Sequence, residues 1–209
     1  MKVRMTSHST PDNIIGVDDA QELIAYCARV SNPGNQNNKD TSEKLIKYLI
    51  KHQHWSPLEM VSACLEIETT RDIARQILRH RSFSFQEFSQ RYADPTKAMS
   101  FQSREARLQD PTNRQNSIPL DFDIESQRRL NEEFRMKQHA LWRESEKIYN
   151  WAIDKGIAKE QARVVLPEGM TISRLYMNGT LRSWVHYIDL RSANGTQKEH
   201  QDIAIACAN

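Results

Sequence analysis

The stretch VSACLEIETTRDIARQILRHR, residues 61–81, changes its hydrophobic period halfway along, and this change joins a strand to a helix. In VSACLEIET the apolar and polar residues alternate, which predicts a strand over 61–69 with one buried face. The apolar residues then recur every three to four positions, which predicts a helix over 70–81. Three arginines lie four residues apart on another side of this helix: Arg71, Arg75 and Arg79.

Helical patterns lie on both sides of this stretch. Before it, a helix is predicted from residue 18 to the breaker NPGNQNN, and a second one follows from residue 40. After it, residues 93–118 are polar and lack apolar periodicity, which predicts a long mobile loop. A long helix is predicted over about 123–156, where a glycine stops it.

The last third of the chain is predicted to contain three more helices and a second strand. The segment AKEQARVVL reads as a short helix that ends before Pro167, and TISRLYM, residues 171–177, reads as a strand. Asn178-Gly179 is a strong turn signal directly after that strand. A helix over 181–191 and a C-terminal helix complete the pattern.

Helix starts carry capping signals at three places. Asp40 with Glu43 and Thr196 with Glu199 each form the spacing of a capping box, in which the two side chains bind the free backbone amides. Thr180 stands where it can cap the helix that begins at residue 181.

The composition is that of a globular protein with 38% hydrophobic and 27% charged residues. A length of 209 residues favours one compact domain, 1–209. No run of eighteen apolar residues occurs and MKVRMTSHSTPDN lacks the apolar centre of a secretory signal, so we expect a cytoplasmic protein without a membrane span. The charge excess is only 29 − 27 = 2, which argues against a general nucleic-acid or membrane-surface binder.

Cysteine and glycine usage excludes several kinds of site. Cys27, Cys64 and Cys207 are odd in number and far apart, which indicates reduced thiols rather than disulfides or a zinc site. The six glycines cannot form a dinucleotide-binding Gly-x-Gly-x-x-Gly motif or a phosphate loop. His52 and His54 are two potential metal ligands without a third acidic ligand nearby, so we expect no metal.

The densest polar cluster is RQILRHRSFSFQEFSQRY, residues 75–92. Guanidinium groups bind phosphate or carboxylate with two parallel hydrogen bonds, while Gln, Glu and Ser can match the edge of a heterocycle. This mixture points to a nucleotide pocket. A solvated basic helix in which Glu87 and Arg91 pair four residues apart is an equally good interpretation of the composition alone.

The order of these residues favours the first interpretation. RHR at 79–81, followed by Ser89 and Arg91-Tyr92, resembles the signature of the flavin-dependent thymidylate synthases. Five further motifs resemble that family in the same order along the chain: CARVS (27–31), HWSPLE (54–59), ARQ (74–76), ARVVLP (162–167) and LRSWVHYIDLRS (181–192).

The resemblance implies an α+β domain with helices packed on a small antiparallel sheet, assembled as a homotetramer with active sites between subunits. It implies FAD as the cofactor, deoxyuridylate (dUMP) as the substrate, and methylenetetrahydrofolate and NADPH as co-substrates, with no nucleic-acid or membrane partner. The positions that match cofactor contacts of the family are Ser31, His54, Ser56, Arg79, His80, Arg81, Gln86, Glu87, Thr180, Leu181, Arg182 and His186. Those that match its substrate contacts are Arg75, Gln76, Arg79, Glu87, Phe88, Ser89, Gln90, Arg91, Arg163 and Arg191. The residues at Gln86, Thr180 and Gly195-Thr196 depart from the usual family pattern.

By this resemblance Arg191 is the catalytic residue. Carbon 5 of uracil is a poor nucleophile unless negative charge on the ring is stabilised, and a fixed guanidinium can do so without a covalent adduct. The three cysteines lie outside every polar cluster, so no thiolate nucleophile is expected. Ser89 has no evident adjacent histidine and is expected to bind substrate with its hydroxyl.

Two other classes of function compete with the enzyme. A non-catalytic nucleotide or RNA-binding module could use the arginine-rich helix for phosphates, but it would be expected to have a larger basic excess and exposed aromatic residues for stacking. A purely structural helical assembly leaves the polar cluster over 75–92 unexplained. The trait that separates these classes is bound flavin.

Overall fold

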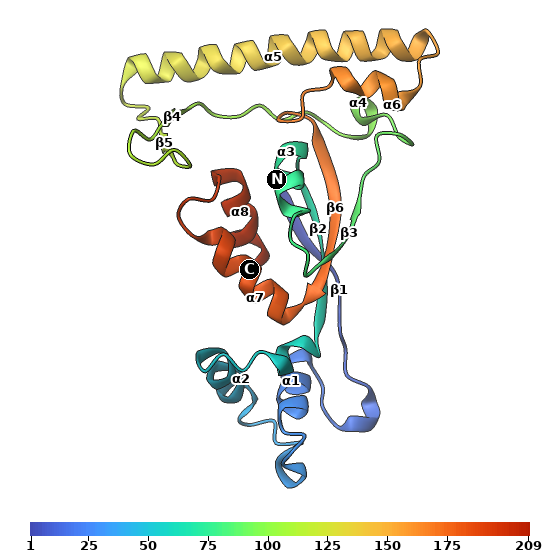
Figure 1. The fold of residues 1–209 in the computed structure, drawn as a ribbon, viewed down its shortest axis with the longest axis vertical. Coiled ribbons are helices and arrows are strands. Elements are labelled where there is room, and N and C mark those ends of the chain that lie inside the picture. The colour runs from blue at the N-terminus through green and yellow to red at the C-terminus, as the bar shows by residue number, and fades with distance from the viewer.

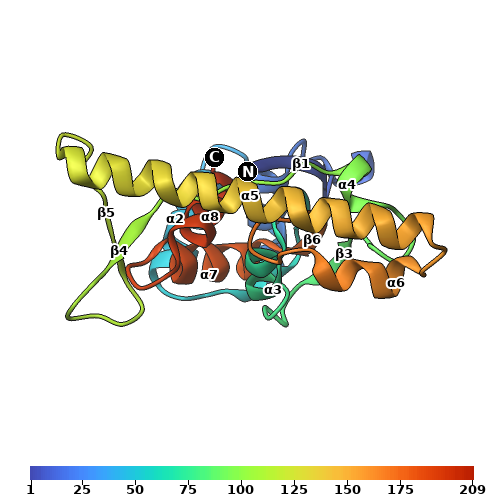
Figure 2. The same cartoon turned by 90° about the horizontal axis from the view of Figure 1, so that it is seen from above.

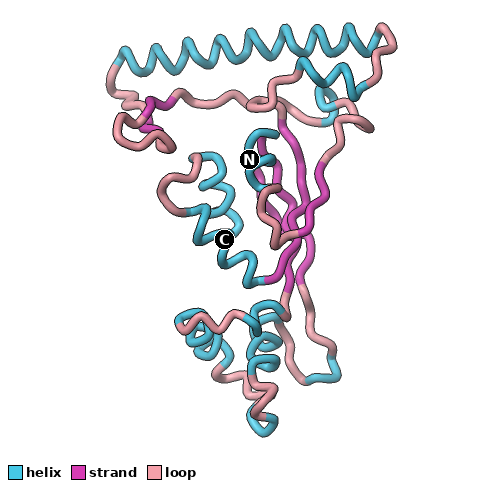
Figure 3. Tube along the Cα trace, viewed as in Figure 1, coloured by secondary structure: helices cyan, strands magenta, loops and turns pink.

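The computed structural model describes residues 1–209, apart from the side chain of Ile14. Its centre is a four-stranded antiparallel sheet in the order β1-β2-β6-β3 (Figures 1 and 3). The strands are β1 (Lys2–His8), β2 (Ser62–Thr70), β3 (Ser84–Glu87) and β6 (Ile172–Thr180). The two central strands, β2 and β6, pair along their whole length. The sheet and the helices around it confirm the predicted α+β class.

The helices surround the sheet on its ends and one side. They are α1 (Ala20–Ala28), α2 (Ser42–Lys51), α3 (Arg71–Ile77), α4 (Pro95–Ala98), α5 (Glu125–Asp154), α6 (Lys159–Ala162), α7 (Leu181–Ser192) and α8 (Lys198–Cys207). The long α5 crosses one end of the sheet, α1 and α2 lie at the opposite end, and α7 and α8 lie beside it (Figure 1). Seen from above, α5 runs across the whole molecule (Figure 2).

The main core lies between the sheet and the helices α3, α7 and α8. Ile67 of β2, Ile73 of α3 and Leu175 of β6 are completely buried in it. Trp184 of α7 packs into the same cluster, and its indole Nε1 donates a hydrogen bond of 3.0 Å to the carbonyl oxygen of Ala63 in β2. Because this bond satisfies the only polar atom of the ring, α7 is held firmly against the sheet.

The predicted helix over 70–81 is shorter in the structure, because α3 ends at Ile77. The N–H of His80 donates to the Ile77 carbonyl at 3.0 Å, and the chain turns from there into β3. Arg79 therefore lies outside the helix, and the predicted stack of three arginines is wrong. Like charges four residues apart repel, whereas Arg71 is buried here and paired with Glu168 at 2.9 Å.

The turn predicted at Asn178-Gly179 is also wrong, since both residues lie inside β6. Asn178 is opposite Cys64 in β2 and Ser84 in β3, so pairing on both edges overrides the local turn preference. Gly179 is required for a different reason. A Cβ atom at this position would stand 2.4 Å from the ring of Phe83, so only glycine lets that ring rest on the strand.

One of the three predicted caps is confirmed. Thr180 caps α7, and its hydroxyl accepts a hydrogen bond of 3.3 Å from the N–H of Ser183. Neither capping box forms, because α2 begins at Ser42, two residues after Asp40, and α8 begins two residues after Thr196. The glutamates expected to close the boxes bind other side chains: Glu43 binds Lys47, and Glu199 binds Gln197.

The segment 93–118 contains short elements that its polar composition did not predict. It holds α4 and β4 (Arg107–Gln109), and β4 pairs with β5 (Ser117–Pro119) to form a small separate sheet. Its mobility stays a prediction. No helix in the described part of the chain combines the length and the apolar character that crossing a membrane requires.

Candidate functional site

The C-terminal turn of α7 is bonded to the turn that follows α3. Arg191, in that last turn, donates from Nε to Nε2 of His80 at 2.9 Å. Burial, followed by the positive charges of Arg191 and Arg79, lowers the pKa of His80 below its usual value of 6.5. His80 is therefore neutral at pH 7, and because its Nε2 accepts a hydrogen bond, its proton is on Nδ1.

Two buried side chains lie directly behind His80. The rings of His80 and Tyr187 meet edge to face with centroids 4.9 Å apart. His200 of α8 is completely buried and lies between the hydroxyl of Tyr187, 3.1 Å from Nε2, and the amide of Gln76, 3.2 Å from Nδ1. The structure thus places the predicted residues Gln76, His80 and Arg191 in one cluster.

Sequence reasoning missed Tyr187, His200 and Gln197, which complete this cluster. The three come from α7, α8 and the residue that precedes α8, and they meet Gln76 only through tertiary packing. One signal was available: His200 stands three residues before Ile203, in the apolar stripe of α8, where a histidine must be buried and hydrogen-bonded.

Two exposed cations flank His80. Arg79 and Arg81 are both exposed, and no carboxylate pairs with either of them among the residues that the structure describes. Elsewhere in the same segment the arginines are neutralised, as Arg75 and Arg91 are by glutamates. Arg79 and Arg81 are therefore free to bind an anion.

Glu87 at the end of β3 lies in a second group of charges. Its carboxylate accepts from Arg75 Nη1 at 3.1 Å and from Ser173 Oγ at 2.8 Å, and Arg71 lies 3.7 Å away. The interpretation of this segment as a basic helix with Glu87 paired to Arg91 is wrong, because Glu87 is in a strand and Arg91 binds Glu160 instead.

Two of the next predicted residues, Arg91 and Arg163, contact α6, and Ser89 and Gln90 directly precede Arg91 in the sequence. Arg91 Nε donates to Glu160 Oε2 at 3.1 Å, and Arg163 Nε donates to the Glu160 carbonyl at 3.3 Å. Gln90 is only 3% exposed, and its Nε2 has no hydrogen-bond partner among the described residues. A buried amide N–H without a partner is costly, so this donor requires a polar partner such as a water molecule or a ligand.

The remaining predicted cofactor residues lie around the first half of α7. Arg182 Nη1 binds Glu59 at 2.7 Å, and the ring of His186 meets Trp55 with centroids 4.5 Å apart. Ser56 lines a cavity of about 400 Å³ together with residues of α1. Ser31, His54 and Gln86 are exposed, and Leu181 and Phe88 are half-buried.

Within one chain the predicted residues form separate groups rather than a single site. Arg182 and Arg191 are nine residues apart on α7, which puts their Cα atoms about 13 Å apart along the helix axis. The group around α6 belongs to other elements again.

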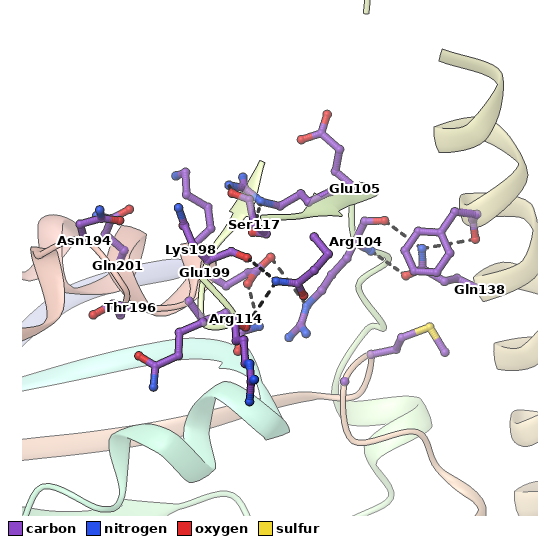
Figure 4. Close-up of a pocket in the computed structure, with 18 of the residues that line it drawn as sticks. Arg104, Glu105, Arg114, Ser117, Gln138, Asn194, Thr196, Lys198, Glu199 and Gln201 are labelled. Carbon is purple, nitrogen blue, oxygen red and sulfur yellow. Dashed lines mark hydrogen bonds and ion pairs between the residues drawn. The ribbon is translucent and has the colours of Figure 1, made fainter. Parts of the chain in front are cut away.

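A cavity of about 650 Å³ lies elsewhere (Figure 4). It opens between the β4–β5 segment, α5 and α8, and none of the predicted site residues lines it. Arg104 and Glu199 face it from different elements, with Arg104 Nε 3.9 Å from Glu199 Oε1. Arg104 also binds Asp72 of α3 at 2.7 Å, so the cavity wall is braced by charge pairs.

The cysteines are not placed to act as nucleophiles. Burial raises the pKa of the Cys27 thiol and raises that of Cys207 to about 12. Cys64 lies in the middle of β2, opposite Asn178. A protonated thiol is a weak nucleophile, so the chemistry of this site does not depend on Cys27 or Cys207.

Comparison with known proteins gives concordant matches over nearly the whole chain. A family model described as thymidylate synthase complementing protein matches residues 13–209. The chain is 49% identical over 207 residues to the “Probable flavin-dependent thymidylate synthase” of Paramecium bursaria Chlorella virus 1, covering 99% of this chain and 92% of that protein. It is 49% identical over 208 residues to the flavin-dependent thymidylate synthase of Synechocystis sp., with the same coverage. The crystal structure of a UMP/dUMP methylase PolB from Streptomyces cacaoi bound with 5-Br dUMP superposes with a TM-score of 0.73 at 25% identity, covering 98% of this chain and 86% of that one.

Proposed function

This chain belongs to the flavin-dependent thymidylate synthase family, and we propose that it methylates dUMP to thymidylate with methylenetetrahydrofolate as carbon donor and NADPH-reduced FAD as hydride source. The observation that carries the proposal is the bond between Arg191 and His80, which fixes an arginine at the end of α7. A cytoplasmic location stays a prediction of the sequence.

Arg191 activates the pyrimidine. Its Nε is held by His80, while no described residue binds its terminal nitrogens Nη1 and Nη2. These two nitrogens can present parallel N–H groups to an edge of the uracil ring and stabilise the negative charge that makes carbon 5 nucleophilic. Because a guanidinium stays protonated at every relevant pH, it stabilises this charge without taking a proton.

His80 acts on Arg191 as an acceptor. A protonated imidazole has no lone pair for Arg191 Nε and would repel the guanidinium, so the lowered pKa of His80 keeps the acceptor available. The neutral ring therefore sets the orientation of the guanidinium plane.

The flavin site rests on the unpaired charges of Arg79 and Arg81 on either side of His80, which fit the diphosphate of FAD. Ser56, Arg182 and His186 extend the site along the first half of α7. Bound there, FAD supplies hydride transfer, which side chains cannot perform.

The substrate site combines the Gln76 and Arg191 group with the Ser89, Gln90 and Arg163 group. The buried and unpartnered Nε2 of Gln90 supports a polar ligand beside it. Ser89 binds rather than attacks, since its Oγ accepts a hydrogen bond of 3.3 Å from the N–H of Arg91 and no histidine among the described residues forms a hydrogen bond with it.

We also propose that the chain assembles as a homotetramer with active sites shared between subunits. The separation of the predicted residues into distant groups supports a site completed by a second copy. Further support comes from α5, where Leu130, Phe134, Leu141 and Ile148 recur at intervals of four and seven residues in one stripe and are each 39–54% exposed. Exposed apolar stripes of this kind mark protein contacts.

The activity is tested with purified full-length protein. We expect a yellow protein whose reduced flavin is reoxidised in the presence of dUMP and methylenetetrahydrofolate with formation of thymidylate. A colourless protein that binds RNA would instead support the non-catalytic module. Bound flavin without any dUMP-dependent turnover would contradict the proposed reaction but leave the fold assignment intact.

The shared site is tested by subunit complementation. Arg191→Ala and Arg91→Ala each remove one arginine, the first from the Gln76 and Arg191 group and the second from the group near α6. Each variant is expected to be inactive alone. If the two groups come from different copies, co-expressed variants regain up to about a quarter of the wild-type activity by random assembly. If the co-expressed variants form mixed tetramers but regain no activity, both groups of each active site come from the same chain.

A further inference from the structure

A chain of five hydrogen-bonded side chains runs behind the substrate residue Gln76. The distances are 3.1 Å from the Tyr187 hydroxyl to His200 Nε2, 3.2 Å from His200 Nδ1 to Gln76 Oε1, 2.7 Å from Gln76 Nε2 to Gln197 Oε1, and 2.9 Å from Gln197 Nε2 to Glu199 Oε2. The members come from α3, α7, α8 and the residue that precedes α8, so the hydrogen-bond chain joins three helices.

The direction of every hydrogen bond in this series of side chains follows from its last member, Glu199. The Glu199 carboxylate, 3.9 Å from Arg104 Nε, can only accept, so the amide nitrogen of Gln197 points toward it. Gln197 then offers its oxygen to Gln76, which must present its own nitrogen on that side and its oxygen to His200.

His200 must therefore donate from Nδ1 and accept at Nε2. The acceptor position is filled by the hydroxyl of Tyr187, which is itself 1% exposed. Burial, followed by the charges of Arg191 and His80, lowers the pKa of His200 to about 4, in agreement with a neutral ring that uses one nitrogen as donor and the other as acceptor.

We infer that His200 is a positioning residue that holds the amide of Gln76 in one orientation for dUMP binding. With Oε1 bound by His200 and one N–H bound by Gln197, Gln76 retains a single free N–H and cannot flip without breaking both bonds. His200 is completely buried and does not itself touch the ligand. The inference rests on the proposed role of Gln76 in the substrate site.

The test is a double-mutant cycle on the FAD-loaded full-length protein, with dUMP affinity measured by calorimetry. His200→Leu removes the donor and should weaken dUMP binding about three- to tenfold, the scale of one hydrogen bond. Because His200 acts through Gln76, the same substitution in a Gln76→Ala background should leave affinity unchanged. His200→Asn keeps an N–H near the Nδ1 position and should restore most of the loss.

Controls separate this role from general destabilisation. Exposed His8→Leu on β1 should leave dUMP affinity at the wild-type value, and FAD content should be unchanged in all variants. An equal loss from His200→Leu in both backgrounds, or no loss at all, would overturn the inference. If Gln76→Ala itself leaves dUMP affinity unchanged, the proposed substrate role of Gln76 fails instead.

Nitrogen-15 NMR of the histidine rings tests the hydrogen-bond chain without any activity measurement. The wild-type protein should show His200 as the Nδ1–H tautomer, unchanged between pH 8 and about pH 5. A ring protonated on Nε2, or one that titrates near pH 6.5, would contradict the chain even if dUMP binds as proposed.

Discussion

Arg191 Nε and His80 Nε2 are 2.9 Å apart, so the end of α7 and the turn after α3 are linked by one hydrogen bond whose acceptor is a neutral imidazole. An arginine at the C-terminus of a helix is also favoured by the helix dipole. The dipole, however, requires only a positive charge, whereas the bond to His80 fixes the plane of the guanidinium. This difference separates a structural from a catalytic role.

Arg191→Lys keeps the charge at the end of α7 but loses the planar pair of N–H groups. We expect turnover to fall about 100-fold or more, the scale of one preorganised donor, with little change in melting temperature. Steady-state thymidylate formation, FAD content and thermal unfolding check this, with Arg143→Lys on the exposed side of α5 as control. Near-normal turnover would remove Arg191 from catalysis.

Replacing both His80 and Arg81 by alanine should abolish flavin retention, because one diphosphate ligand and the imidazole between the two cations are lost together. Flavin absorbance per subunit after gel filtration measures this, and circular dichroism verifies the fold. Arg135→Ala, an exposed arginine of α5, is the matched control for lost charge. Stoichiometric FAD in the double variant would show that the assignment of these residues is wrong.

A triple Cys27→Ser, Cys64→Ser, Cys207→Ser variant that folds should still form thymidylate. The raised pKa values of Cys27 and Cys207 leave these thiols protonated at pH 7, so neither is an effective nucleophile. Product formation by folded, FAD-loaded protein is the measurement. Complete loss of turnover in such protein would contradict the mechanism without an enzyme thiolate.

The free energy of unfolding should fall between pH 6.5 and about pH 4 because of His200. Its folded-state pKa, about 4, lies below the unfolded value near 6.5, so the unfolded chain binds a proton that the fold excludes, and stability is complete only above pH 6.5. The titratable and charged groups that act on the ring are Tyr187, His80 and Arg191, and the positive charges of the last two oppose its protonation. The loss attributable to this one group is about 3 kcal/mol at most.

Urea unfolding across that pH range compares the wild-type protein with His200→Leu. The variant should have a shallower dependence of unfolding free energy on pH over this interval, since its side chain takes up no proton. Parallel curves for the two proteins would mean that His200 titrates alike in the folded and unfolded chains.

Gly179→Ala should destabilise the protein by about 1–3 kcal/mol, the range for overpacking, because the added Cβ would stand 2.4 Å from the Phe83 ring. Phe83→Leu should recover part of that loss when combined with Gly179→Ala, since the smaller side chain can move away. Denaturant unfolding of the two single variants and the double variant measures the coupling. Strictly additive effects would contradict the contact.

The sequence predicted the strand β2, the long helix α5 and the cap of α7, because each depends on residues close together in the chain. It did not predict β1, whose residues are largely exposed at the sheet edge and lack a buried alternating face. Asn178-Gly179 was misjudged because the pairing of β6 with two neighbours depends on segments more than eighty residues away.

The residues of the candidate site also differ in whether nearby sequence or distant packing reveals them. Arg79, His80 and Arg191 were predicted as site residues from motifs that resemble the family, whereas the contacts of Tyr187 and His200 form only when α7 and α8 pack against α3. A buried histidine in an apolar stripe signals a polar network, but the sequence does not give the identity of its partners.

The contact between Gly179 and Phe83 has a wider consequence. Phe83 follows directly after the turn that carries Arg79 and Arg81, so the place of these charges relative to α7 depends on how closely a ring can approach bare main chain. The lack of a side chain at Gly179 in β6 thereby helps to set the position of the two arginines that are proposed to bind an anion. A survey of this enzyme limited to residues with functional groups would pass over a position that carries none, yet helps to determine the geometry of the proposed cofactor site.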